Sequence, residues 1–200
     1  MKEITEERKD GNLSIFIEKL KQFGLDTKLV TETVQGLLRN ATFAINAETN
    51  MAYDGSMIEI VLRQLTPMAI KLNNDLLTES SRVDKDSLVK VCLCQHLSKA
   101  LMFEKNTNQW EIEKRGMLYK FHPSSTSLKM GLKSFLMALG MGIKFTEEEL
   151  EAMTILDKGD DDEQAKYHSN PISYIVKIAN ELVFVNNKFS NTENKTETEQ

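Results

Sequence analysis

Histidine and cysteine, the side chains that most often build metal sites and nucleophilic centres, are scarce in this chain. Its 200 residues include three histidines (His96, His122 and His168) and two cysteines (Cys92 and Cys94). Transition-metal sites commonly need several imidazole or thiolate ligands, so this count nearly excludes a site of that kind. The cysteines are one residue apart in an apolar stretch, where their side chains point in different directions on a helix. We interpret them as buried thiols, not as a disulfide or as part of a catalytic Cys–His pair.

The composition is that of one soluble globular domain with an acidic balance. Hydrophobic residues make up 40% of the chain, charged residues make up 28%, and the net charge is −5. An acidic balance argues against a nucleic-acid partner. No apolar run approaches the roughly 20 residues that span a bilayer, and the charged N-terminus does not resemble a secretory signal. We therefore expect a cytoplasmic protein, or one built into a particle assembled there, with no membrane contact.

The elements that must position these side chains are predicted to be helices. Apolar residues recur at helical spacing along most of the chain, and only three prolines interrupt it. The expected helices lie around residues 13–20, 30–38, 57–65, 87–102, from a cap within 124–127 to 141, from a capping box at 146–149 onward, and 171–188. The polar segment 103–122 predicts a loop or a short β-hairpin. The sequence thus predicts a charged N-terminal arm (1–10), an all-α domain (11–189) and a disordered tail (190–200).

Several short stretches follow one another in an order that resembles a known family. Residues 50–60 read NMAYDGSMIEI, residues 93–99 read LCQHLSK on an apolar helix, and residues 129–134 read KMGLKS. Residues 152–156 then read AMTIL, and the final helix carries Ala179-Asn180. From about Gly11 to Val185 this order is similar to the phage and bacterial HD-domain family, whose members are small helical metal-dependent phosphohydrolases. The resemblance implies an HD-like helical fold.

The same resemblance implies that the family's metal site has been lost. The family's histidines would fall at Asn50, Ile60, Gln95, Met130 and Leu156, and its aspartates at His96 and Asn180. Apolar and amide side chains cannot complete a shell that activates a metal-bound water. The resemblance leaves a vestigial pocket without catalytic residues, metal or cofactor, whose ligand-binding candidates are Asn50, Gln95, His96, Lys99, Lys133 and Asn180.

Three classes of function remain open. The first is a catalytically inactive HD-fold protein with a binding or structural role, for example a phage virion component or a phage–host interaction protein. Such a protein would have a protein partner or would self-assemble. A separate class is ligand sensing in the vacated pocket, with Gln95, His96 and Asn180 as polar anchors. The alternative is a divergent metal-dependent phosphohydrolase acting on nucleotides or phosphodiesters, with a rearranged site built from Asp54, Glu59 and His96.

Overall fold

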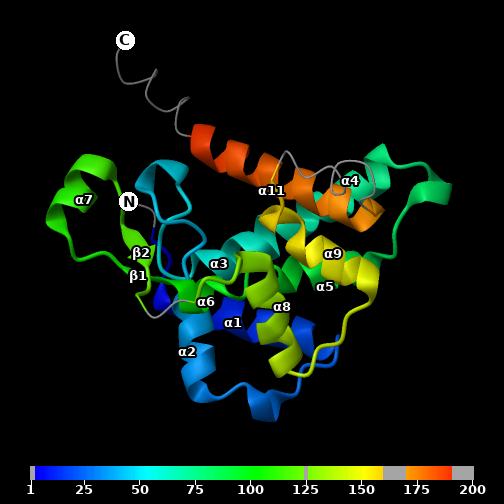
Figure 1. Ribbon diagram of the computed structural model, residues 1–200, viewed down its shortest axis with the longest axis horizontal. Helices are drawn as coiled ribbons and strands as arrows, with labels where there is room; N and C mark the ends of the chain where they lie inside the picture. Colours follow the sequence, from blue (N-terminus) through cyan, green and yellow to red (C-terminus); the bar gives the residue numbers. More distant parts are fainter. Residues whose placement is uncertain (1–2, 124–125, 160–169, 191–200) are drawn as a thin grey trace.

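Helices form almost all of the regular structure in the computed structural model, which describes residues 3–123, 126–159 and 170–190 (Figure 1). The α-helices are α1 (Glu6–Lys21), α2 (Glu32–Asn40), α3 (Ser56–Ile60), α4 (Thr66–Leu76), α5 (Lys85–Cys94), α6 (Lys99–Met102), α7 (Gln109–Arg115), α8 (Met130–Gly140), α9 (Glu147–Thr154) and α11 (Pro171–Phe189). Short helical turns lie at η1 (Thr27–Leu29), η2 (Ala47–Thr49), η4 (Glu79–Ser81) and η5 (Ile155–Asp157), and a π-helical turn at η3 (Val61–Leu65). The predicted all-α class is confirmed.

Helix α5 lies at the centre of the domain. It contacts α4, α9 and α11, and also α1 and α8. Its side chains Leu88, Val91 and Leu93 are fully buried, as are both cysteines. Burial raises the pKa of the Cys92 thiol to about 12. Both cysteines are free and buried, so the prediction of two buried thiols without a disulfide is confirmed.

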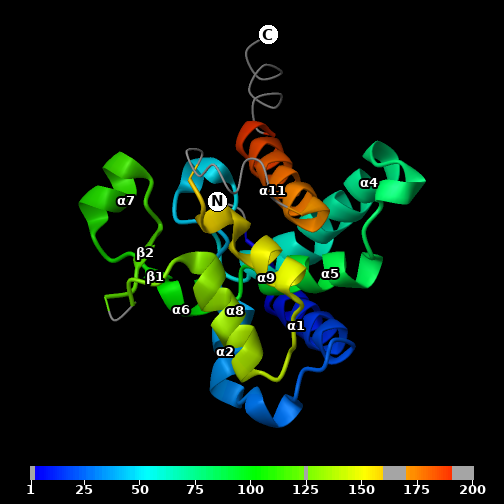
Figure 2. The same cartoon turned by 45° about the vertical axis from the view of Figure 1, so that its right-hand side comes forward.

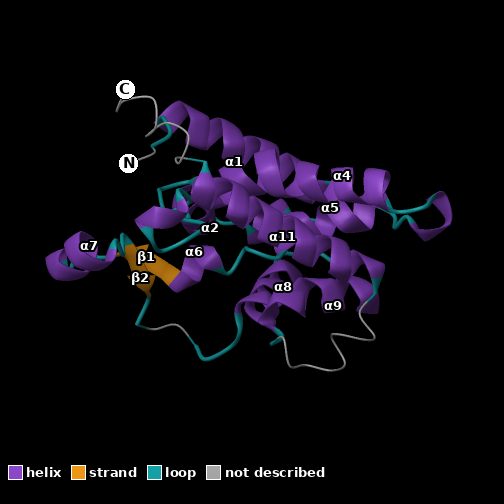
Figure 3. Cartoon of the chain, turned by 90° about the horizontal axis from the view of Figure 1, so that it is seen from above, coloured by secondary structure: helices purple, strands orange, loops and turns teal. Residues whose placement is uncertain are grey.

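The other helices surround α5 and bring the second half of the chain against the first. Helix α11 runs across α4, α5 and α9, and α8 pairs with α9 (Figures 1 and 2). Seen from above, α1, α4 and α5 lie on one side of the domain and α8 and α9 on the other (Figure 3). Helices far apart in sequence therefore converge beside the C-terminal end of α5.

The segment between α6 and α8 contains the predicted β-hairpin. Strands β1 (Phe103–Lys105) and β2 (Tyr119–Phe121) pair in antiparallel register, with Phe103 opposite Phe121. Helix α7 is inserted between them and ends at Gly116, whose φ of 62° suits a residue without a Cβ atom. In Figure 1 the hairpin and α7 lie at one end of the domain.

Local capping signals placed several helix starts correctly. Thr146 and Glu149 form the predicted capping box at the start of α9. Pro171 occupies the first turn of α11, and Asn170 caps that helix by accepting a hydrogen bond from the Ser173 N–H. Helix α1 starts at Glu6 and is capped by Thr5, so the predicted boundary between the arm and the domain, at residues 10 and 11, falls inside a helix.

A single helix over residues 87–102 was predicted, and this prediction is wrong. Helix α5 ends at Cys94, the chain continues through turns at 95–98, and α6 begins at Lys99. The backbone N–H of Ser98 donates to the Ser134 hydroxyl at 3.0 Å, so it is not available to the carbonyl of Cys94, and the Ser98 hydroxyl donates to the carbonyl of Met130. Contacts with α8 therefore replace a local helical hydrogen bond.

Two further helices differ from the sequence predictions. The helix predicted around 57–65 continues into α4 through η3, where the Thr66 N–H bonds the carbonyl of Val61. The π-helical turn immediately precedes Pro67, which has no N–H to donate. Helix α8 starts at Met130, not at a cap within 124–127, and residues 124–125 lie outside the described part of the chain.

Two other features of the sequence analysis fall on residues that the structure does not describe. These are His168, the third histidine, and nearly all of the tail predicted for 190–200. Among the described helices, none is both long and apolar enough to cross a membrane.

Candidate functional site

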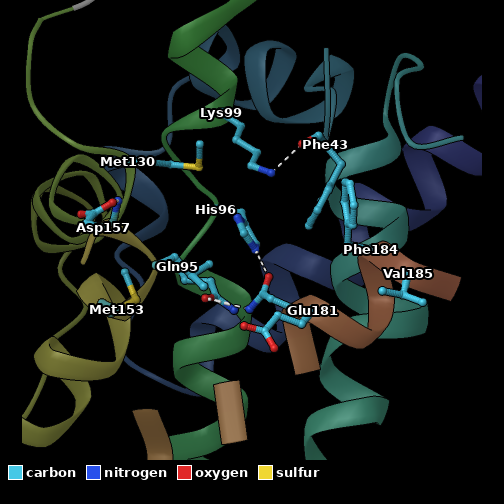
Figure 4. A pocket seen from close by; sticks show the side chains of 13 residues that line it. Phe43, Gln95, His96, Lys99, Met130, Met153, Asp157, Glu181, Phe184 and Val185 are labelled. Atoms are coloured by element: carbon cyan, nitrogen blue, oxygen red, sulfur yellow. Dashed lines mark hydrogen bonds between the residues drawn. The ribbon is translucent and has the colours of Figure 1, made fainter. Parts of the chain in front are cut away.

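A pocket of about 560 Å³ lies beside the C-terminal end of α5 (Figure 4). Its walls come from the turn between α5 and α6, the start of α8, the end of α9 with η5, the middle of α11, and Phe43. This volume falls in the range of small-molecule sites, roughly 300–1,000 Å³. Most of the wall is apolar: Met130 and Met153 lie on one side, and Phe43, Phe184 and Val185 on the other.

Four of the six ligand-binding candidates line this pocket, namely Gln95, His96, Lys99 and Asn180. Asn50 does not line it, because its side-chain amide donates to the backbone carbonyl of Asn187 at 2.8 Å and its backbone adopts a left-handed turn (φ 56°). Lys133 is half-buried on α8 and is not one of the pocket-lining residues.

His96, Asn180 and Gln95 form a chain of hydrogen bonds in the wall of the pocket. Asn180 Nδ2 donates to the Val176 carbonyl at 2.8 Å and to Gln95 Oε1 at 3.3 Å, so Asn180 Oδ1 faces His96 Nε2 at 2.8 Å. Because an amide oxygen only accepts, His96 Nε2 carries the proton and Nδ1 of the neutral ring is left with a lone pair.

The His96 ring is held in the neutral form. Burial lowers its pKa well below 6.5, the nearby Lys99 charge lowers it further, and the hydrogen bond to Asn180 opposes these effects. The ring lies 4.6 Å from the Phe43 ring, centroid to centroid. Among the described residues, neither His96 Nδ1 nor Gln95 Nε2 has a hydrogen-bond partner, although both atoms are buried. Buried polar atoms without partners are uncommon and often mark a binding site.

Lys99 extends into the same pocket from α6 (Figure 4). Its ammonium group donates to the backbone carbonyl of Phe43 at 2.5 Å and lies 3.5 Å from the centroid of the Phe43 ring. Lys99 is 6% exposed, and burial lowers its pKa to about 7. A lysine that is buried without a carboxylate partner is costly to keep charged.

Five of the seven positions that the HD resemblance assigns to metal ligands lie together in the fold. Gln95, His96, Met130, Leu156 and Asn180 all line this one pocket. Asn50 and Ile60, which would supply the first two histidines, do not, and Ile60 is fully buried in the core. The side chains of the first motif, residues 50–60, therefore do not meet at the pocket as those of the later motifs do.

These side chains do not suit a catalytic metal ion. Met130 and Leu156 offer no hard donor, and Gln95 and Asn180 offer only amide oxygens. Asp157, at the edge of the pocket, already accepts hydrogen bonds from two backbone N–H groups of α8. Across residues 3–123, 126–159 and 170–190, no group of three His, Cys, Asp or Glu side chains is placed to hold a metal ion.

The rearranged site proposed from Asp54, Glu59 and His96 is not assembled in the structure. Glu59 is buried and accepts hydrogen bonds from Arg8, Asn12 and Arg63. Asp54 pairs with Lys105 at 2.6 Å and accepts from the Tyr119 hydroxyl. Neither carboxylate lines the pocket that contains His96. Both therefore serve contacts between structural elements away from the pocket.

The motifs did not indicate every residue of the pocket. Phe43 precedes η2 in a loop without a sequence signal, and Phe184 and Val185 looked like ordinary apolar residues of the final helix. No sequence motif indicated the contact of Asp157 with α8.

The chain was compared with protein-family models, with curated proteins and with solved structures, and none of these comparisons finds a match.

Proposed function

We propose that this protein is a non-catalytic, HD-like binding protein whose former metal site is now a ligand pocket. One observation carries the proposal: the side chains that stand in place of the later HD metal ligands surround a single pocket, and all of them except His96 are apolar or amide groups. Replacing charged ligands by apolar side chains removes the cost of burying charges without a metal ion. Such substitutions favour a pocket that binds an organic molecule.

The buried polar atoms support binding over a purely structural role. A pocket kept only as packing would be expected to satisfy its buried donors and acceptors, whereas His96 Nδ1 and Gln95 Nε2 have no partner within the described residues. A bound molecule can supply both contacts. The open side, where Phe184 is 43% and Val185 is 47% exposed, gives a route of entry.

The test of lost catalysis is metal analysis of the purified protein together with a panel of nucleotides and phosphodiesters. We expect no stoichiometric manganese, iron or nickel and no turnover when these ions are added. Stoichiometric metal with turnover would establish the divergent phosphohydrolase instead.

The test of the HD-like scaffold is to restore the missing ligands. A variant carrying Gln95→His, His96→Asp, Met130→His and Asn180→Asp places two imidazoles and two carboxylates around the pocket. If the scaffold is HD-like, this variant binds one manganese ion per chain in calorimetry and the parent protein does not. A folded variant that binds no manganese would contradict the HD assignment.

A role as a virion component or a phage–host interaction protein, with a protein partner or self-association, stays a prediction from the sequence. Co-purification from the native source would test it, because recovery with a virion or with one host protein identifies the partner.

A further inference from the structure

We propose that the pocket takes an amphiphilic monocarboxylate that carries a hydroxyl group near its head. The carboxylate would accept from Lys99 and Gln95, the hydroxyl would donate to His96, and the hydrocarbon body would lie between Met130 and Phe184. This assignment rests on the proposed function, namely that the pocket binds an organic molecule, and it adds the chemical class of that molecule.

The first step is the charge of the head group. Lys99 Nζ can donate three hydrogen bonds, and it makes one to the Phe43 carbonyl. Among the described residues, Lys99 has no carboxylate partner, and its only hydrogen bond is with that carbonyl. A ligand anion beside Nζ would supply the missing countercharge in an apolar setting, where a charge-assisted hydrogen bond is strong.

The second step is the pattern of donors and acceptors. Gln95 is 2% exposed and its Nε2 donor has no partner, which suits a second oxygen of the same anion. His96 is 3% exposed, and its Nδ1 is an acceptor without a donor. A carboxylate alone would leave this lone pair unsatisfied, whereas a neighbouring hydroxyl group satisfies it.

The third step separates a carboxylate from a phosphate monoester. The pocket has one buried ammonium group, and its lining also includes the carboxylates of Asp157 and Glu181. A phosphate dianion would bring one more negative charge than Lys99 can balance. A monoanion is matched by this single cation.

The fourth step is the apolar body. Beyond Lys99 the wall consists mainly of methionine, leucine, phenylalanine and valine side chains, and the pocket volume is about 560 Å³. Methionine side chains adapt to flexible hydrocarbon chains, and Met130 and Met153 lie on the same side (Figure 4). A chain of about ten carbons is therefore the probe that we choose.

The experiment measures binding of 3-hydroxydecanoate, decanoate, decanol and decyl phosphate to the full chain by calorimetry, below their micelle concentrations. We expect 3-hydroxydecanoate to bind most tightly, decanoate several-fold more weakly, and decanol and decyl phosphate at least ten-fold more weakly than decanoate. Equal affinity for decanol and decanoate would overturn the carboxylate assignment, and equal affinity for decanoate and its 3-hydroxy form would overturn the hydroxyl assignment. If decyl phosphate binds most tightly, the assignment of a monoanionic head group is overturned.

Two variants and a control locate the site. Lys99→Met keeps the length of the side chain without its charge, and should remove the preference for decanoate over decanol. Val185→Asp changes an exposed residue at the rim, so it should leave folding intact and weaken decanoate binding at least ten-fold. Lys21→Met, on the exposed face of α1, should bind like the parent. Unchanged decanoate binding by both pocket variants would overturn the site.

The proposed function and this assignment can fail separately. If decanol binds as tightly as decanoate, the proposal of an organic-ligand pocket stands and the assignment of an anionic ligand is wrong. If the protein turns over a phosphodiester with metal, both the proposed function and the ligand assignment are wrong.

Discussion

The carboxylate of Asp157 caps helix α8 from a segment that follows α9. Its two oxygens accept hydrogen bonds from the backbone N–H groups of Gly131 and Leu132, at 2.8 and 2.9 Å. N–H groups in the first turn of a helix have no partner within the helix. A side chain of the residue that precedes the helix usually accepts a hydrogen bond from one of them. Lys129 holds that position and makes no such bond, but its ammonium group donates to the Asp157 carbonyl. Asp157 thus fixes the start of α8, and with it one wall of the pocket.

Removing this cap should destabilise the protein. We expect Asp157→Ala to lower the free energy of unfolding by about 1 kcal/mol, as for other lost helix caps. Asp157→Asn keeps one side-chain oxygen and should lose less. Urea denaturation followed by circular dichroism measures both, and equal stability of Asp157→Ala and the parent would show that the cap contributes nothing.

The close approach of α8 and α9 depends on Gly131. A Cβ atom at this position would lie 2.3 Å from the Met153 carbonyl oxygen and 2.9 Å from the Thr154 Cα, so the two helices would have to separate. We expect Gly131→Ala to lower the free energy of unfolding by about 3 kcal/mol, the upper end for overpacking. Gly140→Ala on the same helix is the matched control. Nothing lies within 4 Å of its new Cβ atom, so the variant should be as stable as the parent or more so. Similar losses for the two variants would contradict this account.

Much of the fold follows from local sequence patterns. The capping box at Thr146 and the proline in the first turn of α11 each depend on residues close together in the chain. Such signals are readable without a structure because their physics is local. The core position of Cys92 likewise follows from its apolar neighbours.

The errors arose where a distant contact overrides the local pattern. The 87–102 helix breaks because Ser98 bonds to a hydroxyl 36 residues away, and α8 starts where Asp157 caps it, 26 residues beyond Gly131. Asn50 is drawn to the backbone of Asn187, 137 residues along the chain, so it does not line the pocket. The order of the motifs indicated that Gln95, His96, Lys99 and Asn180 belong to one pocket. No local pattern could place Phe43 beside them.

Glu59 is expected to be a buried stability determinant, not a catalytic carboxylate. Burial raises its pKa, but hydrogen bonds from Arg8 and Asn12 and the charges of Arg8 and Arg63 outweigh this and hold the pKa below 4.5. We expect Glu59→Gln to lower the free energy of unfolding at pH 7 by about 2 kcal/mol, because hydrogen bonds to a charged group are lost. Glu18→Gln removes an exposed ion pair with Lys21 and should change the free energy of unfolding by less than about 0.5 kcal/mol.

The sign of the pH dependence gives a second check on Glu59. The folded pKa lies below the unfolded one, so the stabilisation is present above about pH 4.5 and is lost as the pH falls through the folded pKa. The parent should therefore lose more stability than Glu59→Gln on acidification, as measured by urea denaturation between pH 5 and pH 3. Parallel losses in the two proteins would contradict the assignment.

Lys99 should make the stability of the protein rise with pH above neutrality. Burial lowers its folded pKa to about 7, whereas the unfolded chain titrates near 10.5. Between these values the unfolded state binds a proton that the folded state lacks, so this residue adds up to about 1.4 kcal/mol of stability per pH unit as the pH rises. Below pH 7 both states are protonated, and the penalty for burying the charge is at its full value.

Replacing Lys99 by methionine removes that penalty together with its pH dependence. We expect Lys99→Met to be more stable than the parent at pH 7, with a difference that shrinks through pH 8 and pH 9 in urea denaturation. Lys21→Met, which changes an exposed lysine, should follow the parent at every pH. A constant difference between Lys99→Met and the parent from pH 7 to pH 9 would mean that the Lys99 ammonium stays charged in the folded protein. The ligand carboxylate that we assign to the pocket would then pair with a Lys99 ammonium group that is charged at every pH from 7 to 9.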